Sequence, residues 1–154
     1  MGTKDENKRL PMYWSAEDTG GIPKPPADAD EVEQKFPSAG EQEKDPQSIL
    51  NYYKAALKIR NRYPDIARGE VTAVTGSLPE GVAAVQRQWQ GETCIILCST
   101  AEGITEINLR ECVPEGYNIK DCLTVDETAV SQKDGLLRSP EYGIAVLKET
   151  GRYS

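Results

Sequence analysis

The residues best suited to chemistry in this sequence are carboxylates, which occur in two closely spaced groups. One group, Glu41, Glu43 and Asp45, offers a pair for acid–base catalysis. Such a pair works at a separation of roughly 5 to 10 Å, in surroundings that raise the pKa of one carboxyl group. Nothing apolar in the sequence encloses these three residues. A solvated acidic face near the start of a helix is therefore the better interpretation.

The second acidic group has the oxygen ligands that a calcium ion prefers: Asp28, Asp30, Glu31 and Glu33. Their spacing is not that of an EF-hand loop, so an exposed charged loop is favoured. We predict no metal site and no cofactor for this chain.

The sequence contains no histidine, which excludes Ser-His and Cys-His catalytic pairs and histidine-ligated zinc. Its four cysteines, Cys94, Cys98, Cys112 and Cys122, lack the paired spacing of a zinc knuckle. On one strand, Cys94 and Cys98 would lie roughly 13 Å apart, too far for a disulfide. We expect small buried apolar side chains, while pairing with Cys112 or Cys122 stays open. We predict no catalytic residue in the chain.

Two tryptophans could serve a binding role, Trp14 and Trp89. Trp89 ends a predicted strand beside a turn, where its ring could stack on a sugar. Packing inside the protein or at an edge is favoured for both residues.

The formal net charge is −7, and the sequence has no long run of Lys or Arg. This argues against a nucleic-acid-binding surface and against binding to an anionic membrane. No stretch is long and apolar enough to span a bilayer. The first eight residues lack the apolar core of a signal peptide, and we expect them to be the cut end of a longer protein.

Residues 1–44 are rich in proline, glycine and charged residues, and bury too little apolar surface to order alone. We expect residues 1–40 of this irregular arm to be the most mobile part of the chain. We also expect residues 12–14 to find no partner surface within the chain. The arm nevertheless holds Met12, Tyr13, Trp14 and Phe36, which suggests packing against something outside the chain.

Residues 45–64 carry a helix signal. Asp45 suits the N-cap, Pro46 suits the first helical position, and Pro64 ends the pattern. The apolar face is wide, and a helix of this length is marginal in water. We therefore expect it to dock on the region that follows, with Leu57 in the apolar seam.

Residues 68–154 change to short strands separated by turns. Eight segments have strand character: 70–75, 82–89, 92–99, 104–109, 117–123, 125–131, 135–138 and 142–148. Gln90 and Gly91 form a plausible tight hairpin. This pattern predicts a mainly β chain, with an antiparallel sandwich or barrel preceded by one helix.

Two segments resemble the α-amylase family of retaining glycoside hydrolases. The first is Arg9-Leu10-Pro11-Met12-Tyr13-Trp14-Ser15, similar to the segment beyond the family's eighth barrel strand. The second is Lys44-Asp45-Pro46-Gln47-Ser48-Ile49-Leu50-Asn51-Tyr52-Tyr53-Lys54, continuing to Ile59-Arg60-Asn61-Arg62-Tyr63-Pro64, similar to the last barrel helix. Both occur in the family's order, followed by a short all-β region.

The resemblance implies three domains: residues 1–44 as a remnant of the barrel's last loop, 45–64 as its last helix, and 68–154 as the β-sandwich called domain C. It implies a parent enzyme that acts on α-1,4-linked glucans, and a fragment that is structural and lacks the family's catalytic carboxylates. Its partner would be the parent's catalytic barrel. Arg9 maps onto a position that contacts substrate in some relatives.

An alternative of another class stays open: a carbohydrate-binding module that tethers the parent to starch, with Trp89 as its stacking residue. The sequence predicts no saturable glucan binding on this basis. Four cysteines without a recognisable disulfide framework favour a reducing cytoplasm. An export signal would lie at the N-terminus of the parent, so a secreted bacterial parent stays open. Localisation is therefore left unknown.

Overall fold

The computed structural model describes residues 4–15, 17, 24–31 and 36–150. The chain divides into two compact units, Met1–Asn51 and Tyr52–Ser154. Each unit is described by itself.

The first unit contains a 3₁₀-helix, η1 (Asp5–Arg9), and a short α-helix, α1 (Ala39–Lys44). A reciprocal capping box fixes the start of α1: the Ser38 hydroxyl accepts a hydrogen bond from the Glu41 N–H, and the Glu41 carboxylate accepts one from the Ser38 N–H at 2.8 Å. The Ser38 hydroxyl also donates to this carboxylate, and these bonds lower the Glu41 pKa.

Residues 13 and 14 contact α1, contrary to the expectation that this segment has no partner within the chain. The carbonyls of Tyr13 and Trp14 accept hydrogen bonds from the N–H groups of Ala39 and Gly40, each at 2.9 Å. These are first-turn donors that a helix cannot satisfy internally. The arm thus supplies part of the cap of α1.

The long helix α2 (Ile49–Arg62) begins later than the sequence suggests. Asp45 ends α1, and its carboxylate accepts a hydrogen bond from the Gln47 N–H at 3.0 Å. The Ser48 hydroxyl instead accepts one from the Asn51 N–H, in the first turn of α2, at 3.2 Å. The predicted start at Asp45 is wrong because Asp45 makes a turn between two helices.

Pro64 does more than end α2, because it is the first residue of a further helix, α3 (Pro64–Arg68). Proline suits this position since its missing N–H would have no partner there. One helix was predicted, at 45–64, whereas the described part of the chain has three α-helices: α1 before this range, α2 within it and α3 from its last residue.

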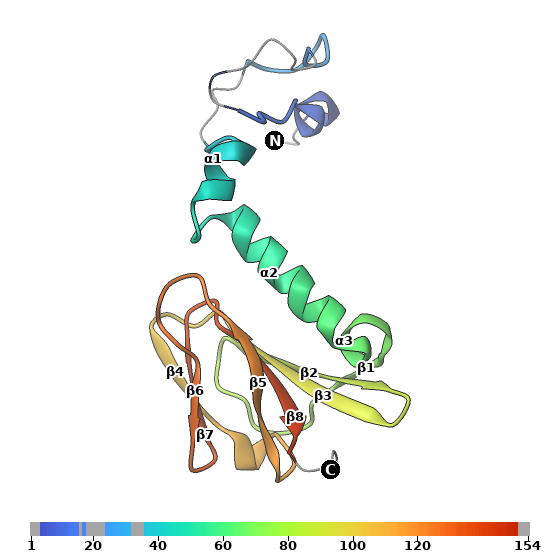
Figure 1. Cartoon of the computed structure of the whole chain (residues 1–154), viewed down its shortest axis with the longest axis vertical. Helices are drawn as coiled ribbons and strands as arrows, with labels where there is room; N and C mark the ends of the chain where they lie inside the picture. The colour runs from blue at the N-terminus through green and yellow to red at the C-terminus, as the bar shows by residue number, and fades with distance from the viewer. Residues whose placement is uncertain (1–3, 16, 18–23, 32–35, 151–154) are drawn as a thin grey trace. The chain divides into compact units, whose positions relative to one another are not determined.

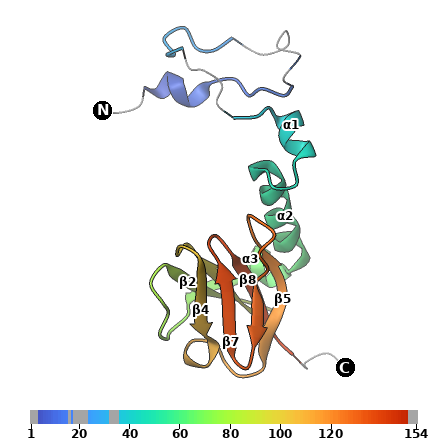
Figure 2. The same cartoon turned by 90° about the vertical axis from the view of Figure 1, so that its left-hand side faces the viewer.

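The described part of the second unit holds eight strands, which is the number predicted: β1 (Glu70–Ala73), β2 (Val82–Trp89), β3 (Glu92–Ser99), β4 (Ile104–Asn108), β5 (Tyr117–Leu123), β6 (Ser131–Lys133), β7 (Leu136–Pro140) and β8 (Ile144–Glu149). They form two antiparallel sheets, ordered β1-β2-β3-β8-β5 and β4-β7-β6. Figure 1 shows the sheets as two layers, and Figure 2 views them from the side of β4 and β7. The expected antiparallel β-sandwich is confirmed.

One predicted strand, 125–131, is wrong, since only Ser131 of it belongs to a strand. Hydrogen bonds between nearby residues hold residues 124–128, which precede Ser131, in a bend. The Thr124 hydroxyl donates to the Asp126 carbonyl at 2.7 Å, and the Asp126 carboxylate accepts from the Thr128 N–H at 2.8 Å. Such side-chain bonds compete with strand pairing.

The turn at Gln90 and Gly91 is confirmed as a tight hairpin between β2 and β3. Both residues have positive φ, 50° and 85°. A two-residue turn of this kind matches the twist of the flanking strands.

The apolar core lies between the two sheets. Ile95 and Leu147 belong to it, and each is at most 1% exposed. Because strand side chains alternate, their neighbours Cys94 and Lys148 point to the other face of the larger sheet. Helix α3 contacts β2 and β3. The larger sheet therefore packs on the smaller sheet through one face and meets α3 on the other.

Helix α2 buries none of its 14 residues. Leu57, expected in an apolar seam against the β-region, is 43% exposed. That expectation is wrong, because Leu57 lies on an exposed face of α2, whereas Ile59, on another face, is half-buried.

Candidate functional site

The two residues proposed for sugar contacts lie in different units. Arg9 is the last residue of η1, and its guanidinium lies 2.6 Å from the exposed Asp5 carboxylate. Trp89 ends β2 and pairs with Glu92 across the hairpin, with its side chain half-buried. Trp14, for which packing was favoured, is instead 67% exposed.

Asp30, a member of the second acidic group, has structural partners. Asp30 accepts hydrogen bonds from the Lys4 ammonium at 2.6 Å and from the Asn7 amide at 2.8 Å. These bonds, with the charge of Lys4, lower the Asp30 pKa. Glu33 lies outside the described residues. In the described part of the chain, no group of His, Cys, Asp or Glu is arranged to hold a metal ion.

The most buried polar site is where α3 meets the larger sheet. The Asp65 side chain is completely buried, and the Lys148 ammonium lies 3.0 Å from its carboxylate. Lys148 also lies 3.5 Å from the Glu92 carboxylate. Burial lowers the Lys148 pKa, but the hydrogen bond and charge of Asp65, with those of Glu92, outweigh it and raise the pKa overall.

Arg87 of β2 holds the backbone of α3. Its guanidinium donates to the Ile66 carbonyl at 2.7 Å and to the Asp65 carbonyl at 3.4 Å. Carbonyls in so short a helix have few internal partners. Arg87 thus gives the Ile66 carbonyl a partner, whereas the Asp65 carbonyl also accepts from the Gly69 N–H at 2.8 Å.

The end of α2 is joined to β5 in the same region. The Arg62 guanidinium lies 2.5 Å from the Asp121 carboxylate, which also accepts from the Tyr63 hydroxyl at 3.4 Å. The Lys148 ammonium lies 5.5 Å from the centre of the Tyr63 ring. We call Asp65, Lys148, Arg87, Arg62, Asp121 and Tyr63 the polar anchor.

Cys94 is buried beside the polar anchor. Burial, followed by the negative charge of Asp65, raises its pKa to about 12. The thiol is therefore protonated near neutral pH and is a poor nucleophile. Cys94 and Cys112 are buried as expected, whereas Cys122 is exposed, and all four cysteines are free thiols. The anchor and its neighbouring thiol are suited to holding elements together.

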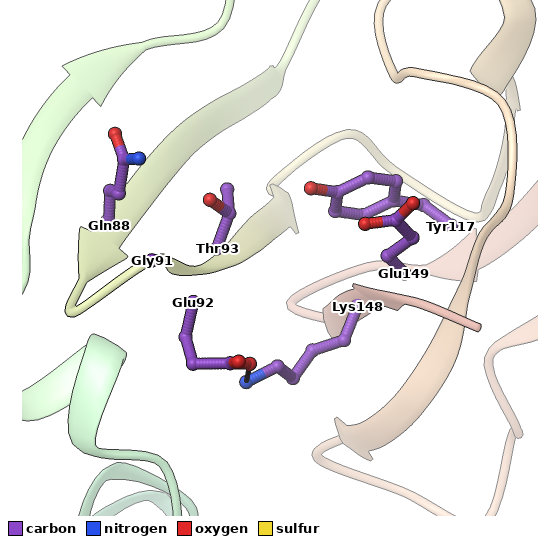
Figure 3. Close-up of a pocket in the computed structure, with 7 residues that line it drawn as sticks. All are labelled: Gln88, Gly91, Glu92, Thr93, Tyr117, Lys148 and Glu149. Carbon is purple, nitrogen blue, oxygen red and sulfur yellow. Dashed lines mark ion pairs between the residues drawn. The ribbon is translucent and has the colours of Figure 1, made fainter. Parts of the chain in front are cut away.

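A cavity of about 260 Å³ opens at the hairpin end of the larger sheet and is lined in part by Lys148 of the polar anchor (Figure 3). Its lining is mainly polar: Gln88, Gly91, Glu92, Thr93, Tyr117, Lys148 and Glu149. The Glu92–Lys148 ion pair lies at its margin. Trp89 does not line this cavity.

Neither the anchor nor the cavity was found by sequence reasoning. Asp65 and Lys148 are 83 residues apart, so no local spacing connects them. One signal was available: Pro64 followed by Asp65 is typical of a helix start, where an acidic residue is favourable.

No family model matches the chain, and neither does any curated protein sequence. Among solved structures, the chain is similar to Eubacterium rectale Amy13B, with 30% identity and a TM-score of 0.85 over 97% of this chain. It also shares its fold with an α-amylase from H. orenii, at 19% identity and a TM-score of 0.59 over 74% of this chain. An isomaltulose synthase from Klebsiella sp. LX3 gives 20% identity and a TM-score of 0.56 over 72%.

The chain spans a minor part of each of these proteins: 29% of Amy13B, 23% of the α-amylase and 19% of the isomaltulose synthase. The resemblance found in its sequence motifs is thereby confirmed, and this chain belongs to the α-amylase family.

Proposed function

We propose that this chain is the C-terminal part of an α-amylase-type enzyme acting on α-1,4-linked glucans, and that this part is structural. The observation that carries the proposal is the 30% identity to Amy13B over 97% of this chain, which spans only 29% of that protein. The two sequence motifs resemble segments that the family has beyond its eighth barrel strand, which supports this position in the parent. The catalytic carboxylates of the parent would then lie in the remaining part.

The proposed partner is the catalytic barrel of the same parent chain, and the proposed contact is the outer face of α2. Tyr53 and Leu57, one helical turn apart, are 64% and 43% exposed. The neighbouring Lys58 and Arg60 are exposed too, and α2 has no acidic residue. Such a face suits an apolar surface bordered by carboxylates.

The test uses the full-length parent with Leu57→Asp, which places a charge in the proposed interface. We expect the variant to have a lower melting temperature. On heating, its starch hydrolysis should be lost over the same lower temperature range. Val71→Asp is the matched control, because Val71 is an exposed aliphatic residue of β1, outside α2. Equal behaviour of the two variants would contradict the proposed contact.

The structural role has its own test. Residues 1–154 alone should release no reducing sugar from starch or maltooligosaccharides. Release above a blank, at a rate that further purification leaves unchanged, would contradict it. In the parent, Arg9 is proposed to contact the glucan, so Arg9→Ala there should raise KM.

A further inference from the structure

Gln132 is a polar residue on the core face of the smaller sheet. It pairs with Leu137 across β6 and β7, and residues paired in an antiparallel ladder have their side chains on the same face. Leu137 is completely buried and belongs to the core between the two sheets. Because an amide shielded from water needs hydrogen-bond partners, a glutamine at this position requires polar groups opposite it.

The partners of Gln132 belong to the other sheet. Strand β5 forms one edge of the larger sheet, and β6 of the smaller sheet lies beside it (Figure 1). The Gln132 side chain accepts a hydrogen bond from the Ile119 N–H at 2.9 Å and donates one to the Tyr117 carbonyl at 3.0 Å. It also donates to the side-chain oxygen of Asn118 at 3.3 Å. Gln132 thus joins the two sheets through the backbone of β5.

The two backbone groups that Gln132 holds point away from β8, toward the free edge of β5. On the β8 side, the Gly116 carbonyl accepts a hydrogen bond from the Thr150 N–H at 2.9 Å. Hydrogen-bonded and non-hydrogen-bonded pairs alternate along an antiparallel ladder, so Tyr117 and Ile119 are in non-hydrogen-bonded pairs with β8. A side-chain amide has an acceptor and donors as a backbone peptide does. Gln132 therefore takes the place of a neighbouring strand.

A strand edge with outward N–H and C=O groups is a template for a further strand. The groups held by Gln132 are a donor and an acceptor two residues apart, which makes them self-complementary. In a second copy related by a two-fold axis through Asn118, the Ile119 N–H of each copy would face the Tyr117 carbonyl of the other. Beyond this point the ladder shifts its register, between Ile119 and Asp121, which disrupts the edge. Gln132 therefore covers the regular part of the edge.

We infer that Gln132 is an edge lock. It occupies the pairing groups of β5 and thereby prevents a second copy of this chain from adding its own β5 at that edge. The lock is independent of the proposed function, because every contact that it uses lies within residues 116–150.

The test compares unmodified residues 1–154 with Gln132→Met, which keeps the length of the side chain and removes its amide. Analytical ultracentrifugation and backbone amide exchange are measured at about 10 μM and about 1 mM protein, where weak association becomes visible. The unmodified chain should be monomeric, with slow exchange of the Ile119 N–H at both concentrations. In the variant, this exchange should be roughly tenfold faster at the lower concentration, because a hydrogen bond is lost. At the higher concentration the variant should form a dimer, and the exchange should slow again.

Ser131→Val is the matched control, because Ser131 precedes Gln132 on β6, is exposed and points to the other face of the sheet. This variant should stay monomeric, with Ile119 exchange as in the unmodified chain. Fast exchange of the Ile119 N–H in the unmodified chain would overturn the inference without any variant.

Three results with the variants would also overturn it: a Gln132→Met chain that stays monomeric at about 1 mM, a dimer in which the Ile119 N–H still exchanges rapidly, or equal association of Ser131→Val. In the second case the two copies would meet away from β5. Gln132→Ala provides a second variant if Gln132→Met does not fold, and the same outcomes apply to it.

Discussion

The Lys148 ammonium lies 3.0 Å from the carboxylate of Asp65, although the two residues are 83 positions apart. Asp65 is in the first turn of α3, and Lys148 is on β8. The pair joins the helical region to a central strand of the larger sheet. Because the Asp65 side chain is wholly buried and Lys148 only 16% exposed, solvent screens this pair far less than a surface pair.

Removing one partner of this pair should cost more than removing both. Lys148→Met leaves a buried carboxylate without its cation, and we expect the free energy of unfolding to fall by about 3 kcal/mol. Asp65→Leu should destabilise similarly, because the ammonium loses its principal partner. The double variant should be less destabilised than either single variant, because it leaves no buried charge without a partner. Urea denaturation of all four proteins measures this coupling, and strictly additive losses would contradict it.

Stability should fall as pH rises into the alkaline range. Cys94 has its pKa raised from 9.0 to about 12, and the pKa of Lys148 is raised above 10.5. Between pH 9 and 12 the unfolded chain therefore loses these protons before the folded chain does. The contribution of both groups is fully present below pH 9 and is lost at higher pH.

Urea midpoints measured from pH 8 to 10.5 test this slope. Cys94→Ala should make the decline shallower, and should lower stability below pH 9 because a buried sulfur atom beside the polar anchor is lost. A flat profile in the unmodified protein, or an equal slope in the variant, would exclude the proposed role of the Cys94 thiol.

The parts of the fold that were predictable depend on neighbouring residues. Strands β2 and β3 and their turn follow from apolar patterning around Gln90 and Gly91. The polar anchor depends on contacts that only the folded chain creates. The sequence around Asp65 therefore gave no indication that Lys148 would be its partner. The prediction that Leu57 packs on the β-region was wrong for a related reason. The spacing of Leu57 indicates an apolar face of the helix, but spacing alone does not identify what covers that face.

The Gln90–Gly91 hairpin allows the effect of backbone conformation to be measured separately from side-chain packing. Gly91 has φ of 85°, and a Cβ added there would meet nothing within 4 Å. Gly91→Ala should therefore destabilise the chain by about 1 kcal/mol through backbone strain alone. Gln90→Asn, at φ of 50°, should raise stability because asparagine tolerates this region better. The melting temperatures of both variants test these expectations. A higher melting temperature for Gly91→Ala would be inconsistent with this turn.

Substitutions on two faces of α2 test how the helix relates to the sandwich in residues 1–154. Leu57 is exposed, so Leu57→Asp should change the free energy of unfolding by less than about 0.5 kcal/mol. Ile59 is half-buried on the same helix, and Ile59→Asp should cost at least about 1 kcal/mol through lost apolar burial and charge desolvation. Both variants place aspartate near the C-terminal half of α2, so helix propensity and dipole effects are similar. If Leu57→Asp were the more damaging of the two in this chain, its face would already be covered here, and the proposed interface on α2 would be wrong.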